Sequence, residues 1–249
     1  MPNHDSLALM AGSVTPVWLF DLDNTLHDAG AQIFGEVNRT MSAYVQRELG
    51  VTASEADHLR RQYFLRYGAT LLGLVRHHGV RAAHFLHDTH RFPNLAQQVS
   101  SHPADLQVLQ RLAGRKYVLT NAPRDYAVRV LRLLGIERLF DGVLSIEDMS
   151  MFGHLRPKPD ARMFKRIAVR LGVHPSRCVL VEDTLVHQKA ARSVGMRTVW
   201  MQRYLRRLHP NTGLPVHRAG RPAYVDVKLS GLRPLLSWRG AESVFTCTL

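Results

Sequence analysis

Short, β-rich apolar segments alternate with longer segments of helical periodicity along most of this chain. Such alternation is typical of α/β proteins, whose strands pair in parallel and are covered by helices on both faces. Ligands of these folds bind beyond the carboxyl ends of the strands. The pattern therefore predicts an α/β fold with a doubly wound parallel sheet. The expected strands include residues 17–20, 117–119, 142–146, 178–181 and 198–201.

The alternation is interrupted once, between residues 29 and 101, where no segment has the character of a strand. Phe34, Val37, Met41 and Tyr44 recur there at helical spacing, which predicts amphipathic helices. We therefore expect a helical cap inserted into an α/β core. The expected boundaries are 14–27 and 103–238 for the core, 28–102 for the cap and 239–249 for a C-terminal tail.

The composition is that of an ordinary globular protein, with 45% hydrophobic and 21% charged residues among 249. No segment approaches the roughly 20 apolar residues that a membrane-spanning helix requires. The first fifteen residues contain no Lys or Arg, with which secretory signals begin, so we expect a cytoplasmic protein with no membrane partner. The formal charge of +13 would suit nucleic acid, an anionic surface or an acidic substrate. Part of this charge lies in an expected irregular loop at residues 203–221.

The sharpest chemical signal is the motif FDLDNT at residues 20–25, where an apolar segment ends in two carboxylates. Phosphoryl transfer can use both: Asp21 would attack phosphorus and form an aspartyl-phosphate, while Asp23 protonates the leaving oxygen and later deprotonates water. A magnesium ion beside Asp21 would keep it ionised, whereas an Asp23 turned away from the metal could hold a proton near neutrality. Taken alone, the pair also fits an Asp-rich turn or a simple cation site.

Polar side chains also occur after the second apolar segment and before a later helix. Thr120 and Asn121 offer a hydroxyl and free backbone amides that can hold phosphate oxygens, or they could cap the helix that follows. Lys158 lies between two prolines that restrict its backbone. Its ammonium could neutralise charge on the phosphoryl group, or it could belong to a surface turn in which Asp160 caps the next helix.

Glu182 and Asp183 follow the apolar segment 178–181. Hard cations such as Mg²⁺ prefer carboxylate oxygens, so we expect Asp183 to be a metal ligand and Glu182 to support it. Either acid could also be an ordinary residue of a helix start. The four clusters all lie at predicted strand ends or beside them, so the fold would bring them together. Together they would supply a nucleophile, an acid, phosphate donors and a metal ligand.

In order and spacing, the four motifs resemble the haloacid dehalogenase-like superfamily of phosphatases over about residues 16–238. The resemblance implies a Rossmann-like core and a C1 cap, with Asp21 as the nucleophile. It further implies that the main-chain carbonyl of Asp23 binds Mg²⁺, so the expected metal ligands are Asp21, Asp23 and Asp183. The residues expected to support these ligands are Thr25, Glu182 and His187.

Several finer features resemble the pyrimidine 5'-nucleotidase branch of that superfamily: YGATLLGL at residues 67–74, His87-Asp88, and TNAPRD at residues 120–125. Two positions depart from the branch, which usually has Gly where this chain has Ala122 and Asn where it has His187. A neutral imidazole can replace an amide as a hydrogen-bond partner but is a poor direct ligand for magnesium. We therefore expect the protein to bind its metal ion, with a changed hydrogen-bond partner next to the metal ligands.

Aromatic and imidazole side chains in the expected cap allow two interpretations. Tyr63 and Tyr67 could stack on a nucleobase, although residues at this helical spacing more often belong to a core. His84, His87 and His90 recur every three residues, and we interpret them as ordinary helix residues rather than a zinc-binding face.

We therefore predict a Mg²⁺-dependent, 5'-nucleotidase-like phosphatase acting on small phosphate monoesters, with pyrimidine nucleoside 5'-monophosphates such as UMP and CMP as substrates. One alternative is a phosphatase or phosphomutase for another small metabolite such as a sugar phosphate. A second alternative is a nucleic-acid-binding protein on a hydrolase scaffold. Only the basic charge supports it, and the intact Asp21, Asp23, Lys158 and Asp183 argue against it.

Overall fold

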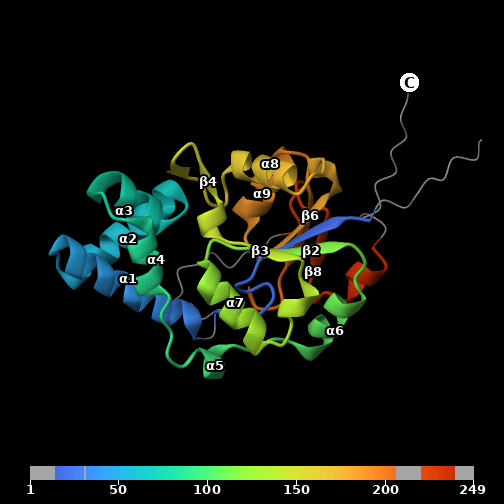
Figure 1. The fold of residues 1–249 in the computed structure, drawn as a ribbon, viewed down its shortest axis with the longest axis horizontal. Coiled ribbons are helices and arrows are strands. Elements are labelled where there is room, and N and C mark those ends of the chain that lie inside the picture. Colours follow the sequence, from blue (N-terminus) through green and yellow to red (C-terminus); the bar gives the residue numbers. More distant parts are fainter. Residues whose placement is uncertain (1–14, 31, 206–219, 239–249) are drawn as a thin grey trace, which may run out of the picture.

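The computed structural model describes residues 15–30, 32–205 and 220–238, and within these ranges one six-stranded parallel sheet forms the centre of the molecule. Its strand order is β3-β2-β1-β6-β7-β8, so the chain winds outward from β1 in one direction and then from β6 in the other (Figure 1). The predicted doubly wound parallel sheet is confirmed. The strands are β1 Val17–Phe20, β2 Arg115–Leu119, β3 Gly142–Leu144, β6 Cys178–Glu182, β7 Arg197–Met201 and β8 Val227–Leu229.

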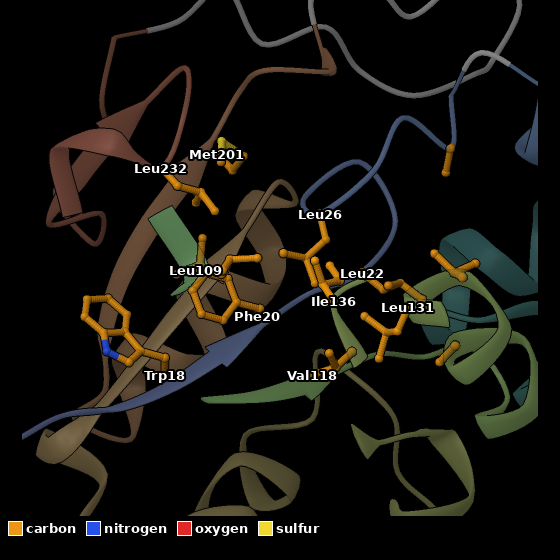
Figure 2. Packing of buried hydrophobic residues seen from close by; sticks show 14 of the residues in the cluster. Trp18, Phe20, Leu22, Leu26, Leu109, Val118, Leu131, Ile136, Met201 and Leu232 are labelled. Atoms are coloured by element: carbon orange, nitrogen blue, oxygen red, sulfur yellow. The ribbon is translucent and has the colours of Figure 1, made fainter. Parts of the chain in front are cut away.

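Side chains of the central strand β1 alternate between two layers of the core, as a strand buried on both faces requires. Trp18 and Phe20 pack with side chains from α6, Pro103–Arg111, and α7, Arg124–Leu133 (Figure 2). Val17 and Leu19 point to the other face. They pack there against the helices α8, Ala161–Arg170, and α9, Leu185–Ser193, so that helices cover both faces (Figure 1).

The register of the sheet places the carboxyl ends of its central strands at one level. Val17 of β1 is paired with Arg115 of β2 and with Cys178 of β6. Beyond the strand, the backbone N–H of Asp21 still donates to the carbonyl of Val181 at 2.9 Å. The residues that follow β1, β2 and β6 therefore meet at the same edge of the sheet.

The predicted cap is a helical bundle inserted between β1 and β2 (Figure 1). It has its own apolar centre, which includes Tyr44, Tyr63, Leu74 and Phe85. Thr52 and Glu55 form a capping box at the start of its second helix, which satisfies backbone N–H groups that a helix start leaves free. The limits 28 and 102 stay a prediction. The helices are α1 Ile33–Leu49, α2 Ala53–Tyr67, α3 Thr70–His78, α4 Ala82–Thr89 and, after the bundle, α5 Leu95–Gln98.

Several local features differ from the sequence-based expectations. A small hairpin of β4, Ser150–Met151, and β5, His154–Leu155, precedes Lys158 where no strand was predicted. After β8 the chain forms a short 3-10 helix, Arg233–Leu236. Most of the expected basic loop, residues 206–219, and the whole expected tail, residues 239–249, lie outside the described residues. None of the helices within the described ranges has the length and apolar character needed to cross a membrane.

Candidate active site

The polar motifs predicted from the sequence converge at the carboxyl edge of the sheet. Asp21 directly follows β1, Thr120 directly follows β2, and Glu182 ends β6. Strands β1 and β6 are the neighbours between which the winding direction changes. In doubly wound sheets this switch point is the place where ligands bind, because the connecting loops diverge there and leave a crevice.

Lys158 links three of these strand ends through a single buried ammonium. Its Nζ donates to Asp21 Oδ1 at 2.6 Å, to Glu182 Oε2 at 2.7 Å and to the carbonyl of Leu119, the last residue of β2, at 2.9 Å. The side chain is 1% exposed. A lysine has three N–H donors, so protein acceptors already use all of them. Lys158 therefore fixes the Asp21 carboxylate directly, and none of its N–H groups is left to donate to a bound anion.

Asn121 holds the segment that presents Lys158. Its side-chain amide donates to the carbonyl of Lys158 at 2.9 Å, and its side-chain oxygen accepts from the backbone N–H of the same residue at 2.9 Å. This pairing explains why an amide residue follows Thr120. The helix cap that the sequence also allowed is not formed by Asn121, since α7 begins after Pro123 without a side-chain cap. Asp160 does cap α8, by accepting from the N–H of Arg162 at 2.9 Å.

The balance of charge around Lys158 is negative, with three buried carboxylates against one ammonium. Burial and the neighbouring Glu182 raise the pKa of Asp21 to about 7. Burial, Glu182 and Asp21 raise the pKa of Asp183 well above its ordinary value. Burial would also raise the pKa of Glu182, but Lys158 and His187 outweigh it and hold that pKa far below the usual range. For Lys158, burial favours a lower pKa, and the two carboxylates outweigh it and raise the pKa.

This excess of carboxylate fits a divalent cation. Ligand oxygens of Asp21, Glu182 and Asp183 lie within 4.8 Å of one another. The backbone of Asp183 is fixed by Trp200, whose indole N–H donates to its carbonyl at 2.9 Å. Oxygen ligands in such a cluster suit Mg²⁺, which also retains several waters when bound. Nδ1 of His187 lies 3.1 Å from Glu182 Oε1, so the imidazole faces the carboxylate on the side away from Lys158.

The carboxylate of Asp23 lies outside this acidic cluster, and the metal ligand expected at this residue is its main-chain carbonyl. Its Oδ1 accepts a hydrogen bond from His27 Nε2 at 2.9 Å and from the hydroxyl of Tyr126 at 2.7 Å. Burial would raise the pKa of Asp23, but these two hydrogen bonds and the field of the imidazole lower it. With its pKa lowered in this way, Asp23 is ionised at neutrality, whereas a protonated Asp23 was expected from the sequence.

The side chains expected to hold phosphate or to support the metal lie beside the same edge. The hydroxyl oxygen of Thr120 accepts from the N–H of Ala122 at 3.0 Å, which leaves its own O–H free to donate. Thr25 is buried, and its hydroxyl has no hydrogen-bond partner among the described residues. Asn24 adopts a left-handed backbone conformation with φ of 59° and accepts from the N–H of Gly30 at 2.8 Å, which shapes the loop leaving Asp23.

The two cap tyrosines have different surroundings. Tyr63 is buried in the cap bundle, with its ring stacked on His77 and its hydroxyl 2.7 Å from His78 Nε2. Tyr67 ends α2 and, with Leu72, lines a cavity of about 300 Å³ between the cap and residues 155–160 of the core. Of the two, Tyr67 is therefore the side chain that a ligand between cap and core could reach.

Two residues at the site, His27 and Tyr126, were not predicted from the sequence. His27 lies four positions after Asp23, and this spacing carries no chemical signature. Tyr126 comes from α7, 103 positions along the chain from Asp23. At its helical position it is indistinguishable from a core residue, so only the folded structure identifies its contact with Asp23.

Comparisons with known proteins find several relatives at low sequence identity. Phosphate metabolism protein 8 of Saccharomyces cerevisiae is 25% identical over 192 residues, which cover 72% of this chain and 59% of the yeast protein. The chain thus spans less than two thirds of that relative's length. Pyrophosphatase PpaX of Bacillus velezensis is 24% identical over 198 residues, which cover 72% of this chain and 80% of PpaX.

Solved structures share the fold at low sequence identity. The crystal structure of a HAD phosphatase from Thermococcus onnurineus matches with a TM-score of 0.59 and 22% identity, covering 92% of this chain and all of that one. The structure of CbbY from Rhodobacter sphaeroides in complex with phosphate matches with a TM-score of 0.58 and 20% identity, covering 89% of this chain and 96% of that one.

The family comparison covers the whole site. The family described as haloacid dehalogenase-like hydrolase matches residues 17–195, a range that contains Asp21, Thr120, Lys158 and Asp183. Because this match spans well over half of the chain, the protein belongs to the haloacid dehalogenase-like hydrolase family.

Proposed function

We propose that this protein is a magnesium-dependent phosphatase that transfers the phosphoryl group of a small monoester to Asp21 and then to water. The observation that carries the proposal is the position of the Asp21 carboxylate, 2.6 Å from the ammonium of Lys158 at the switch point of the sheet. A fixed carboxylate flanked by positive charge suits attack on a phosphate dianion. The names of several relatives, PpaX among them, also describe phosphate-releasing enzymes.

In the first half of the reaction, an oxygen of Asp21 attacks phosphorus and the bond from phosphorus to the ester oxygen breaks. The electron pair leaves with the ester oxygen, which takes a proton from Asp23. Asp23 takes up this proton from solvent when the phosphate dianion binds, because a like charge beside the carboxylate raises its pKa. In the second half, water attacks the aspartyl-phosphate and gives a proton to Asp23, and the bond from phosphorus to Asp21 breaks.

Magnesium would be held by Asp21, Asp183 and the main-chain carbonyl of Asp23, with Glu182 and His187 in support. When bound, the ion supplies positive charge that keeps Asp21 ionised and offsets charge on the phosphoryl oxygens. Thr120 would donate its free hydroxyl hydrogen to a phosphoryl oxygen. Lys158 would hold Asp21 in its attacking position.

The proposed substrates are pyrimidine nucleoside 5'-monophosphates. The support is the resemblance of residues 67–74 and 120–125 to the corresponding nucleotidase branch. Residues 67–74 include the turn from α2 to α3, which lies against the segment that carries Lys158: a Cβ added at Gly68 would be 3.0 Å from Pro159 Cδ. The cap would therefore contact the leaving group next to the phosphate site and exclude water from it.

A sugar phosphate is the second candidate. Fructose-1-phosphate phosphatase YqaB of Escherichia coli is 31% identical over 96 residues, which cover 38% of this chain and 48% of that protein. The match supports the same chemistry with a different leaving group. A mutase that uses the same aspartyl-phosphate would retain the phosphate on its product, whereas a phosphatase releases it. The expected cytoplasmic location stays a prediction.

The first test is phosphate release from UMP, CMP, their deoxy forms, purine monophosphates and sugar phosphates, with Mg²⁺ and with a chelator. We expect turnover only with Mg²⁺, highest on UMP or CMP, and none above background for Asp21→Asn, which lacks the nucleophile. Asp141→Asn, at an exposed position before β3 and outside the motifs of the site, is the matched control and should keep wild-type turnover.

Thermal unfolding gives a second readout that does not depend on turnover. Mg²⁺ at about 100 times its dissociation constant should stabilise the wild-type fold by about 2.7 kcal/mol, and this gain should be absent from Asp183→Asn. Metal-dependent turnover of a sugar phosphate alone would retain the mechanism and reject the nucleotide substrate. Failure to release phosphate from any ester would contradict the proposed function and favour a binding protein.

A further inference from the structure

The carboxylate of Asp23 is held at one of its two oxygens. His27 Nε2 and the Tyr126 hydroxyl both donate to Oδ1, at 2.9 and 2.7 Å. Because a carboxylate has no proton to give, His27 must be the donor through Nε2–H. Oδ2 accepts no hydrogen bond from the residues that the structure describes, and the Asp23 side chain is 21% exposed.

Both donors are buried, and Tyr126 is also held by packing. His27 is fully buried, and Tyr126 is 2% exposed. The Tyr126 ring packs edge-on against Phe92, with ring centroids 5.4 Å apart. One turn further along α7, Arg129 donates to the carbonyl of Phe92 at 2.7 Å, so the segment that packs on Tyr126 is also fixed. Donors locked by packing hold their acceptor in one orientation.

We propose that His27 and Tyr126 are positioning residues that fix Asp23 through Oδ1, so that Oδ2 is the oxygen that exchanges a proton with the leaving group and with water. This inference rests on the proposed phosphatase activity and assigns the atom that carries out its acid and base steps. Neither residue contacts the reacting phosphate; both act through Asp23.

The two steps of the reaction each move one proton at Oδ2 while Oδ1 stays hydrogen-bonded. When the bond from phosphorus to the ester oxygen breaks, the proton on Oδ2 passes to that oxygen and leaves Asp23 ionised. When water attacks the aspartyl-phosphate, its proton returns to Oδ2. In both steps Oδ1 keeps its two hydrogen bonds, so the carboxyl group does not rotate, and a fixed orientation of an acid is worth a large part of its contribution to rate.

The dependence on the leaving group separates this role from a structural one. The p-nitrophenolate of the aryl ester p-nitrophenyl phosphate leaves well without a proton, whereas the alkoxide of an alkyl ester needs one. Tyr126→Phe should lower kcat/KM for the alkyl ester that wild type cleaves fastest by about tenfold, and for p-nitrophenyl phosphate by no more than about twofold. The quantity kcat/KM is chosen because it reports steps up to the first irreversible one, which includes departure of the leaving group.

Substitutions at His27 give an independent comparison. His27→Gln keeps an N–H donor at similar reach and should retain most of the alkyl-ester activity, whereas His27→Leu removes the donor and should lose about tenfold or more. Tyr117→Phe, on β2, is the matched control for loss of a tyrosine hydroxyl and should leave both esters unaffected. Thermal unfolding of each variant checks that the fold is retained.

Equal losses of Tyr126→Phe on both esters would overturn the inference, because they would place its effect on the nucleophile or on the fold. An unchanged kcat/KM on both esters would overturn it as well. In either case the wild-type turnover and its dependence on Asp21 would still support the phosphatase. If the wild type cleaves neither ester, the proposed function itself fails, and this result is distinct because it precedes any comparison of variants.

Discussion

His90 shows how a single side chain ties the cap to the chemistry of the core. It follows α4, and its ring packs edge-on against Phe92 and Tyr126, with centroids 6.1 and 5.7 Å away. Burial lowers the pKa of His90 to about 4, even though the charge of Asp23 acts in the opposite direction. The imidazole is therefore neutral at physiological pH and serves as an apolar contact for Tyr126.

We expect His90 to make the fold less stable in mild acid. The unfolded chain protonates this histidine near pH 6.5, while the folded state resists protonation until about pH 4, so unfolding takes up a proton and stability falls as pH decreases between these values. His90→Gln should lose less free energy of unfolding between pH 7 and pH 5 than wild type, by on the order of 1–2 kcal/mol. Urea unfolding at both pH values measures the difference.

His154→Gln provides the control, because His154 is exposed on β5. It should reproduce the wild-type change between the two pH values. If His90→Gln and His154→Gln lose the same stability on acidification, His90 does not couple folding to protons.

The positions of the candidate site residues were predictable where they follow a strand, because an apolar segment marks the edge at which they meet. Asp21 and Asp183 are of this kind. His27 and Tyr126 could not be found in that way. The spacing of His27 from Asp23 carries no chemical signature, and Tyr126 reaches Asp23 from 103 positions along the chain. The partner of Asn121 was hidden for the same reason: its amide pairs with the backbone of Lys158, 37 positions away.

At the scale of elements, the strands and helices of the core could be predicted because they alternate and end in glycines or polar residues. The β4–β5 hairpin could not, since its strands have two residues each and show no periodicity. Its turn places Phe152 at φ 50° and Gly153 at φ 75°, and a phenylalanine is an unusual residue for the left-handed region. Sequence patterns thus locate long elements and miss those defined by turn geometry.

The contact of α2 with α3 depends on the absence of a side chain at Gly73. A Cβ at this position would lie 2.1 Å from Tyr63 Cγ, inside the buried centre of the cap. We expect Gly73→Ala to destabilise the cap by about 1–3 kcal/mol, because overpacking outweighs the gain in helix propensity. Hydrogen exchange of α2 and α3 measures the effect on the cap separately from the core.

Gly35→Ala is the matched control, since Gly35 is exposed on α1 and a Cβ there would meet only the flexible end of Arg39, at 3.6 Å. This variant should be as stable as wild type or more stable by up to about 1 kcal/mol. Equal protection of α2 and α3 in both variants would show that Tyr63 moves aside without cost.

Across the whole molecule, Lys158 joins strand ends that the chain brings together from distant segments. Its ammonium contacts Asp21 after β1, the last carbonyl of β2 and Glu182 of β6. Such a buried group of charges adds little to the stability of the fold when all its members are present, but removal of one member leaves an uncompensated buried charge. The site and the stability of the sheet edge therefore depend on the same residue.

Lys158→Met retains the length of the side chain and removes its charge. We expect it to lower the free energy of unfolding by about 3–5 kcal/mol, because Asp21 and Glu182 would be left buried without a counter-charge. Lys189→Met, on the exposed side of α9, should change stability by no more than about 0.5 kcal/mol. Urea unfolding without divalent cations gives both values, and equal stability of the two variants would contradict this account.

The placement of β1 at the centre of the sheet also has a consequence for biogenesis. Val17 of β1 pairs with Arg115 on one side and with Cys178 on the other, so its two neighbours are translated long after it. At ribosomal speeds the second neighbour follows on the order of ten seconds or more later. During that interval the segment Val17–Phe20 is an unpaired apolar strand on the nascent chain, the kind of segment that chaperones retain and that aggregates when they do not. The insertion of the cap between the first two strands lengthens this exposure.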